Sequence, residues 1–209
     1  MSNFNYKLEI ELIPKINKIQ NIIILELGVQ KGISTIKFLE LCKKNNGKLF
    51  SVDIDDCSSV SNDENWTFLR SRDDNFQYIK SLVPKKIDIL YIDTLHEARH
   101  VKNIIYNYYD LIKVGGYLFI DDISHLPYLD KKKTSFYCEI NNKETFDMLL
   151  SIYYYNQNCF DLNFCFKSSG LAIIRKNSDT KLTEIKKLKL RSNSIKNFVR
   201  KIWQKLKKN

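Results

Sequence analysis

The residues of this 209-residue chain that best suggest chemistry are three aspartates, which follow two short apolar runs. Asp93 comes directly after the run 87–92, and Asp121 and Asp122 come directly after the run 117–120. A helical pattern and a pair of glycines separate the runs, which is typical of parallel strands joined by a helix. Strands joined in this way end at the same edge of the sheet, where open α/β sheets bind ligands. The three carboxylates are therefore expected to converge, and to bind a cation, share protons or repel one another.

A second group of informative residues follows the first predicted strand, at residues 22–27. This strand contains Glu26 and continues into Gly28 and Gly32, in the pattern E-x-G-x-x-x-G. Glycines at such a turn let backbone N–H groups approach a ligand at the start of the next helix. Asp53 ends the second predicted strand, where a carboxylate can accept hydrogen bonds from both ribose hydroxyls of a nucleoside.

The class of ligand follows from a departure from the dinucleotide-binding pattern. That pattern requires a glycine where this chain has Gln30, and a bulky residue there would crowd a pyrophosphate. Glu26 also suits a cationic ligand better than a phosphate. S-adenosylmethionine is a nucleoside that carries an amino acid and a positive sulfonium, so it satisfies the glycines, Asp53 and Glu26 together. We therefore predict S-adenosylmethionine as the cofactor.

The other elements place these residues in an α/β fold. Strands are predicted at 22–27, 49–52, 66–69, 87–92 and 117–120, with helices at 33–44, 71–83, 96–112 and 144–155. Two further strands, 160–166 and 171–175, flank a four-residue loop and indicate an antiparallel hairpin. The prediction is a doubly wound, mostly parallel Rossmann-like sheet that ends in this hairpin. A leading helix with Pro14 in it (1–20) precedes this domain (21–176), and a basic helical tail (177–209) follows it.

The positive charge of the chain lies in that tail. From Lys176 to the end there are 12 Lys and Arg residues and 2 Asp and Glu residues, whereas the first 175 residues carry 22 of each. A nucleic-acid-binding face is therefore not expected on the body. Ile195, Phe198, Ile202 and Trp203 belong to an apolar stripe at helical spacing, and Ser192 or Ser194 is a candidate N-cap. Such a helix suits an anionic membrane surface, the protein's own body, a dimer partner or RNA.

The stretch from about residue 22 to 175 resembles the class I S-adenosylmethionine-dependent methyltransferases. ILELGVQKG is similar to the first motif of this class, SVDID to the second, and YIDTLH and GGYLFIDD to later ones. Within the class, the sequence is most similar to metal-dependent small-molecule O-methyltransferases of the catechol and macrocin type. The resemblance implies the class I methyltransferase fold and a transferase that binds S-adenosylmethionine and magnesium.

The resemblance also implies roles for individual residues. It places Asp93, Asp121 and Asp122 as ligands of Mg²⁺, and His96 as the base that deprotonates the acceptor. Three carboxylates without a nearby Cys favour Mg²⁺, Mn²⁺ or Ca²⁺ over zinc, and histidine accepts protons near neutral pH. Asp73 lies in the adenine-contacting segment, and Asp93 is expected both to contact the cofactor and to take part in catalysis. His100 and His125 are alternative bases.

The expected reaction is metal-assisted O-methylation of a small hydroxylated acceptor, for example a sugar of a glycan or a secondary metabolite. The N-methyltransferase tetrapeptide [DN]PP[YF] is absent, which argues against an amide or base acceptor. The alternatives are a methyltransferase of RNA or protein recruited by the tail, and a nucleotide-binding module without chemistry. The five cysteines form no CxxC pair and the N-terminus lacks signal-peptide features, so we expect a cytoplasmic protein, peripheral at the inner membrane surface if the tail binds lipid. A homo-oligomer is compatible with the sequence.

Overall fold

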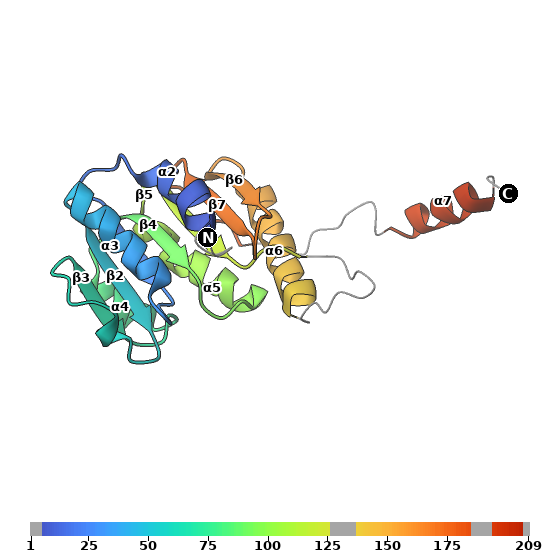
Figure 1. Ribbon diagram of the computed structural model, residues 1–209. Coiled ribbons are helices and arrows are strands. Elements are labelled where there is room, and N and C mark those ends of the chain that lie inside the picture. Colours follow the sequence, from blue (N-terminus) through green and yellow to red (C-terminus); the bar gives the residue numbers. More distant parts are fainter. Residues whose placement is uncertain (1–5, 126–136, 185–193, 207–209) are drawn as a thin grey trace.

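The computed structural model describes residues 6–125, 137–184 and 194–206, which contain one seven-stranded sheet (Figure 1). The strand order is β3-β2-β1-β4-β5-β7-β6, and β7 is antiparallel to both of its neighbours whereas the other pairs are parallel. The strands are β1 (Ile23–Leu27), β2 (Lys48–Asp53), β3 (Trp66–Arg70), β4 (Ile87–Ile92), β5 (Ile112–Asp121), β6 (Phe160–Cys165) and β7 (Leu171–Lys176). The predicted doubly wound sheet with a terminal antiparallel hairpin is confirmed.

Helices cover both faces of the sheet. The helical segments of the described residues are η1 (Lys7–Leu12), α2 (Ile13–Ile16), α3 (Ile33–Asn45), η2 (Ser58–Val60), α4 (Phe76–Leu82), α5 (Ala98–Tyr108), η3 (Tyr109–Leu111), η4 (Tyr137–Asn141), α6 (Asn142–Tyr155) and α7 (Ile195–Leu206). Helices α4, α5 and α6 bury residues such as Ile104 and Leu149 against one face. Elements η1, α2 and α3 bury Leu8, Leu12 and Phe38 against the other. Because β4 is covered on both faces, all of its residues are buried, as in the central strand of a parallel sheet.

Three helices have features that affect the site. In α3, the apolar residues Ile33 and Ile36 are 46% and 41% exposed, whereas Ser34 and Thr35 are buried. The polar pair is buried because both hydroxyls donate hydrogen bonds to the carboxylate of Glu26. Helices α4 and α5 begin at Phe76 and Ala98, later than expected, which leaves residues 71–75 and 93–97 in loops at the carboxyl edge of the sheet.

The boundaries of the body also differ from the expected ones. The leading segment is helical from Lys7 to Ile16, with Pro14 in the first turn of α2. Beyond β7, Leu182 is buried and the N–H of Thr183 donates to the side-chain oxygen of Asn156, so the body extends to about residue 184. The candidate cap Ser192 lies outside the described residues.

Helix α7 lies apart from the sheet (Figure 1). The Oγ of Ser194 accepts a hydrogen bond from the N–H of Asn197, which confirms the predicted N-cap. Among the described residues, no helix is long and apolar enough to span a membrane.

Candidate active site

A cavity of about 730 Å³ opens at the carboxyl ends of β1, β2 and β4, a volume that suits a small molecule. Of the predicted site residues, Gly28, Asp53, Asp73, Asp93 and His96 line it, whereas Glu26, Gly32, Asp121 and Asp122 do not. His100, the alternative base, also lines the cavity. The glycine turn at Gly28 and the end of β2 at Asp53, which were both expected to bind the cofactor, therefore lie around one cavity.

The turn after β1 brings the backbone of β1 unusually close to that of β4. Gly28 has a φ of +94°, and a Cβ built on it would lie 1.9 Å from the carbonyl oxygen of Asp93. The N–H of Asp93 donates to the carbonyl of Leu27, and the N–H of Gly28 donates to the carbonyl of Val52. Only glycine fits here, because a side chain would separate the turn from Asp93.

Asp53 supports the same turn. Its Oδ2 accepts hydrogen bonds from the N–H groups of Val29 (2.8 Å) and Gln30 (3.0 Å), and its Oδ1 accepts one from Asp55 (3.0 Å). Partial burial opposes ionisation, yet these backbone donors hold the pKa of Asp53 below its ordinary value. Asp53 therefore favours the ionised form at the wall of the cavity.

Glu26 has a different position from the one expected of a residue that contacts the cofactor. It is fully buried, and its carboxylate accepts hydrogen bonds from Ser34 (2.5 Å), Thr35 (2.8 Å) and Ser51 (2.6 Å). Burial raises the pKa of Glu26 to about 7, although the three hydroxyls favour the carboxylate. Glu26 thus joins β1 to β2 and to the start of α3. Gly32 has a similar supporting role, since it is the N-cap of α3 with a φ of +72° and contacts Val60.

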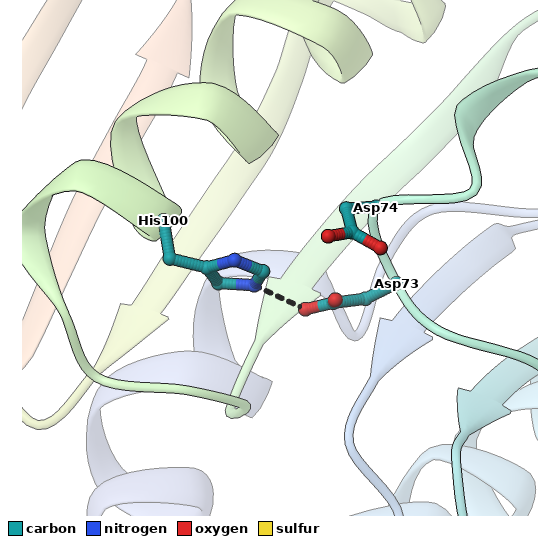
Figure 2. A group of neighbouring side chains, drawn as sticks. All are labelled: Asp73, Asp74 and His100. Atoms are coloured by element: carbon teal, nitrogen blue, oxygen red, sulfur yellow. Dashed lines mark hydrogen bonds and ion pairs between the residues drawn. The ribbon is translucent and has the colours of Figure 1, made fainter.

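Asp73 and His100 also line the cavity, and their side chains point toward each other (Figure 2). The Nε2 of His100 lies 2.7 Å from the Oδ2 of Asp73, and this contact raises the pKa of His100. Asp74 lies beside them and pairs with Arg72 at 2.6 Å. The side chain of His100 is 12% exposed and that of His96 is 31% exposed, so His96 is the more accessible of the two candidate bases.

The predicted acidic cluster forms at the ends of β4 and β5. The hydroxyl of Tyr91 donates to Asp121 at 3.1 Å and lies 3.5 Å from Asp93. The Nε2 of His96 lies 3.2 Å from Asp122 and 3.6 Å from Asp93. Asp122 has a φ of +58°, a conformation that costs a non-glycine residue energy and is frequent at functional sites. His96 is therefore held between two carboxylates at the edge of the cavity.

The cluster also contains a cation that the sequence did not reveal. Lys7 of η1 is 1% exposed, and its ammonium contacts the Oδ1 of Asp121 and the Oγ of Ser169. Burial and the charges of Asp121 and Asp122 raise the pKa of Asp93 to about 8, and Lys7 opposes this shift. The ammonium thus neutralises only part of the negative charge. No local pattern identifies Lys7, because its partner lies far away in the sequence.

The residues fit a divalent cation by chemistry but not by arrangement. Carboxylate oxygens are the ligands that Mg²⁺ and Mn²⁺ prefer. Among the described residues, however, only one group of three His, Cys, Asp or Glu side chains has its ligand atoms within 4.8 Å of one another. This group is Asp73, Asp74 and His100 (Figure 2). Asp93, Asp121 and Asp122 are not gathered in this way, and Asp121 is already paired with Lys7. The predicted metal ligands therefore lie in one cluster without forming a ready-made metal site.

Comparisons with known proteins agree with this geometry. Residues 25–123 match a family described as a methyltransferase domain, and no curated protein matches the sequence. MycE methyltransferase from the mycinamycin biosynthetic pathway, solved with Mg and S-adenosylhomocysteine (SAH), has a TM-score of 0.62 and 16% identity. That match covers 85% of this chain and 53% of the other, so this chain spans about half the length of MycE.

Two further structures match over more of their own length. A Staphylococcus aureus protein described as a caffeoyl-CoA O-methyltransferase has a TM-score of 0.61 and 18% identity over 85% of both chains. A Clostridium thermocellum protein described as an rRNA methylase has a TM-score of 0.58 and 13% identity, over 79% of this chain and 93% of its own. At these identities the likenesses establish the fold and leave the acceptor open.

The sheet order and the antiparallel β7 define the fold of the class I methyltransferases. The match to the methyltransferase-domain family covers residues 25–123. The matched segment contains the glycine turn, Asp53, Asp73 and the whole acidic cluster except Lys7.

Proposed function

We propose that this enzyme transfers a methyl group from S-adenosylmethionine to a hydroxyl oxygen of a small acceptor. The observation that carries the proposal is the position of His96, which lies at the edge of the cofactor cavity between Asp93 and Asp122. A sugar of a glycan or a secondary metabolite has the required hydroxyl. MycE, whose structure with Mg, SAH and mycinamycin VI matches at a TM-score of 0.58 and 16% identity, supports this class of acceptor.

In the proposed reaction, His96 accepts the hydroxyl proton of the acceptor while the hydroxyl oxygen of the acceptor attacks the methyl carbon. A new oxygen–carbon bond forms, the sulfur–carbon bond breaks, and SAH leaves as the neutral product. The carboxylate of Asp122 stabilises the imidazolium that results, much as a buried carboxylate does in a catalytic triad. Asp53 and Gly28 hold the nucleoside so that the methyl group faces the acceptor, and alignment of this kind can supply about 7–11 kcal/mol at most.

A divalent cation is a further part of the proposal. Asp93, Asp121 and Asp122 would hold Mg²⁺, Mn²⁺ or Ca²⁺, and such an ion lowers the pKa of a coordinated hydroxyl.

The proposal is tested by calorimetric titration of the purified protein with SAH, with and without Mg²⁺. We expect SAH to bind in both conditions, because Gly28, Asp53 and Asp73 do not require the ion. Release of SAH would then be measured with S-adenosylmethionine and a panel of catechols and vicinal-diol sugars. Absence of SAH binding would refute the cofactor assignment. Binding without turnover across the panel, but with turnover of RNA, would favour the nucleic-acid alternative.

We also propose that α7 attaches the enzyme to an anionic membrane surface. Its apolar residues Ile195, Phe198, Val199, Ile202, Trp203 and Leu206 are between 45% and 85% exposed. Lys196, Arg200 and Lys201 are exposed on the same helix, so its charge complements an anionic lipid surface. A basic amphipathic helix with tryptophan is the usual form of an interfacial membrane anchor. In that case the enzyme is a cytoplasmic protein that is peripheral at the inner membrane surface.

Arg200→Gln combined with Lys201→Gln is expected to weaken binding to anionic vesicles about thirtyfold, since each basic residue contributes about 1 kcal/mol near such a surface. Co-sedimentation with phosphatidylcholine vesicles, with and without phosphatidylglycerol, measures this binding. Lys15→Gln combined with Lys18→Gln removes the same charge from exposed positions on the body and should have little effect. If the protein bound neutral vesicles as strongly as anionic ones, the anionic membrane would be excluded as partner. It would also be excluded if the two substitutions dissociated a homo-oligomer and left lipid binding unchanged.

A further inference from the structure

The ammonium of Lys7 occupies a position that a cation bound to Asp121 would need. Lys7 contacts Oδ1 of Asp121 and lies 2.5 Å from the hydroxyl oxygen of Ser169, and both ionised side chains are 1% exposed. A buried charge pair of this kind is held in place strongly, because separating the partners leaves an uncompensated buried charge. Lys7 is therefore a fixed part of the carboxylate cluster.

The hydrogen bonds of Asp121 leave little room for another ligand. Its Oδ1 also accepts from the N–H of Asp122 at 2.7 Å and from Ser169 at 3.2 Å, and its Oδ2 accepts from Tyr91 at 3.1 Å. A carboxylate has about four lone-pair sites, so this one is close to saturated. A cation can therefore bind Asp121 directly only after at least one partner has left, and Lys7 is the partner that carries the competing charge.

Lys7 cannot leave without affecting the leading segment. The residues beside it and one and two turns along, Leu8, Leu12 and Ile16, are buried against the sheet. Lys167, from the turn between β6 and β7, binds the hydroxyl of Tyr6 at 2.7 Å. Movement of the Lys7 ammonium is thus coupled to the packing of η1 against the sheet and the hairpin turn.

We propose that Lys7 is a resident counter-cation that competes with a divalent cation for Asp121, so that cation binding is coupled to release of η1 from its present packing. The inference rests on the proposed cation site at Asp93, Asp121 and Asp122. It accounts for why these carboxylates are close together yet not gathered to metal-binding distances. One ammonium offsets one of three carboxylates, whereas a divalent ion supplies two charges to the same cluster.

The test is a titration of the full chain with Mn²⁺, followed by electron paramagnetic resonance of the free ion. Lys7→Met should bind Mn²⁺ at least about tenfold more tightly than the wild type, which is within the usual range of coupling between two ligands. Lys176→Met is the matched control, because Lys176 also carries a buried ammonium, which contacts the carbonyls of Tyr109 and Ile112 and the carboxylate of Asp179. Its affinity for Mn²⁺ should equal that of the wild type.

A second measurement on the wild type does not depend on how well the variant folds. Saturating Mn²⁺ should accelerate hydrogen exchange of the η1 amides while leaving those of β4 protected. Equal Mn²⁺ affinities in wild type and Lys7→Met, with unchanged exchange in η1, would overturn the competition. Absence of Mn²⁺ binding in every variant would overturn it too, but SAH binding by the same samples would leave the cofactor part of the proposed function intact.

Discussion

His96→Gln is expected to lower kcat by about 10² to 10⁴, the usual contribution of a general base, while the affinity for SAH changes by less than about threefold. The imidazole is 31% exposed, so it is accessible to an acceptor, and it lies 3.2 Å from Asp122, whose carboxylate would stabilise its protonated form. Glutamine retains a polar side chain of similar length but cannot take up a proton. Release of SAH, measured with the acceptor that the panel identifies, gives kcat, and calorimetry gives the affinity for SAH.

His100→Gln is the matched control, because His100 lines the same cavity and has the same ring. Since its Nε2 is engaged by Asp73, this change should weaken SAH binding and leave kcat largely intact. Added imidazole should partly restore turnover in His96→Gln, which a merely structural defect would not allow. If His100→Gln lost kcat and His96→Gln did not, the roles proposed for the two histidines would be reversed.

The meeting of the acidic residues could be predicted from the sequence because it depends on a general property of the fold. Two parallel strands joined by a helix must end at the same edge, so Asp93 and the pair after β5 had to approach each other. Strand β4 pairs with β1, and this pairing brings Asp93 to the turn at Gly28 for the same reason. A pattern of strands and their carboxyl ends therefore predicts the location of the cavity.

The partners of individual side chains could not be predicted in this way. Glu26 precedes the glycine turn, which suggests contact with a ligand, but Ser34 and Thr35 turn inward to bind it. A hydrophobic pattern assigns apolar residues such as Ile33 and Ile36 to the core. It does not take into account that buried hydroxyls can form the hydrogen bonds that a buried carboxylate needs. Lys7 was missed for a related reason, since a lysine next to apolar residues is normally assigned to solvent.

The loop after β4 is a third feature that local sequence patterns do not predict. Helical periodicity extends back to His96, yet α5 begins only at Ala98, with Glu97 in an extended conformation. The extended residues allow the His96 side chain to approach Asp122. Had the helix begun at His96, the imidazole would have been part of a helical first turn. The sequence thus identifies the functional residue, but the backbone that presents it depends on tertiary contacts.

Gly28→Ala is expected to destabilise the protein by about 3–5 kcal/mol and to weaken SAH binding by about a hundredfold. The added Cβ would lie 1.9 Å from the backbone oxygen of Asp93, and backbone cannot yield as a flexible side chain can. The strand and the turn must therefore separate, which displaces both Asp93 and the N–H groups bound by Asp53. Chemical denaturation measures the stability, and calorimetry with SAH measures the affinity.

Gly115→Ala separates this steric effect from backbone strain. Gly115 has a φ of +83°, close to that of Gly28, but a Cβ there meets nothing within 4 Å. Its substitution should therefore cost only the conformational strain of about 1–2 kcal/mol and leave SAH affinity unchanged. If the two variants were equally stable and bound SAH equally well, the contact between the Gly28 turn and Asp93 would not be what shapes the cofactor site. A loss of SAH affinity confined to Gly28→Ala would instead show that the close approach of β1 and β4 is required for cofactor binding.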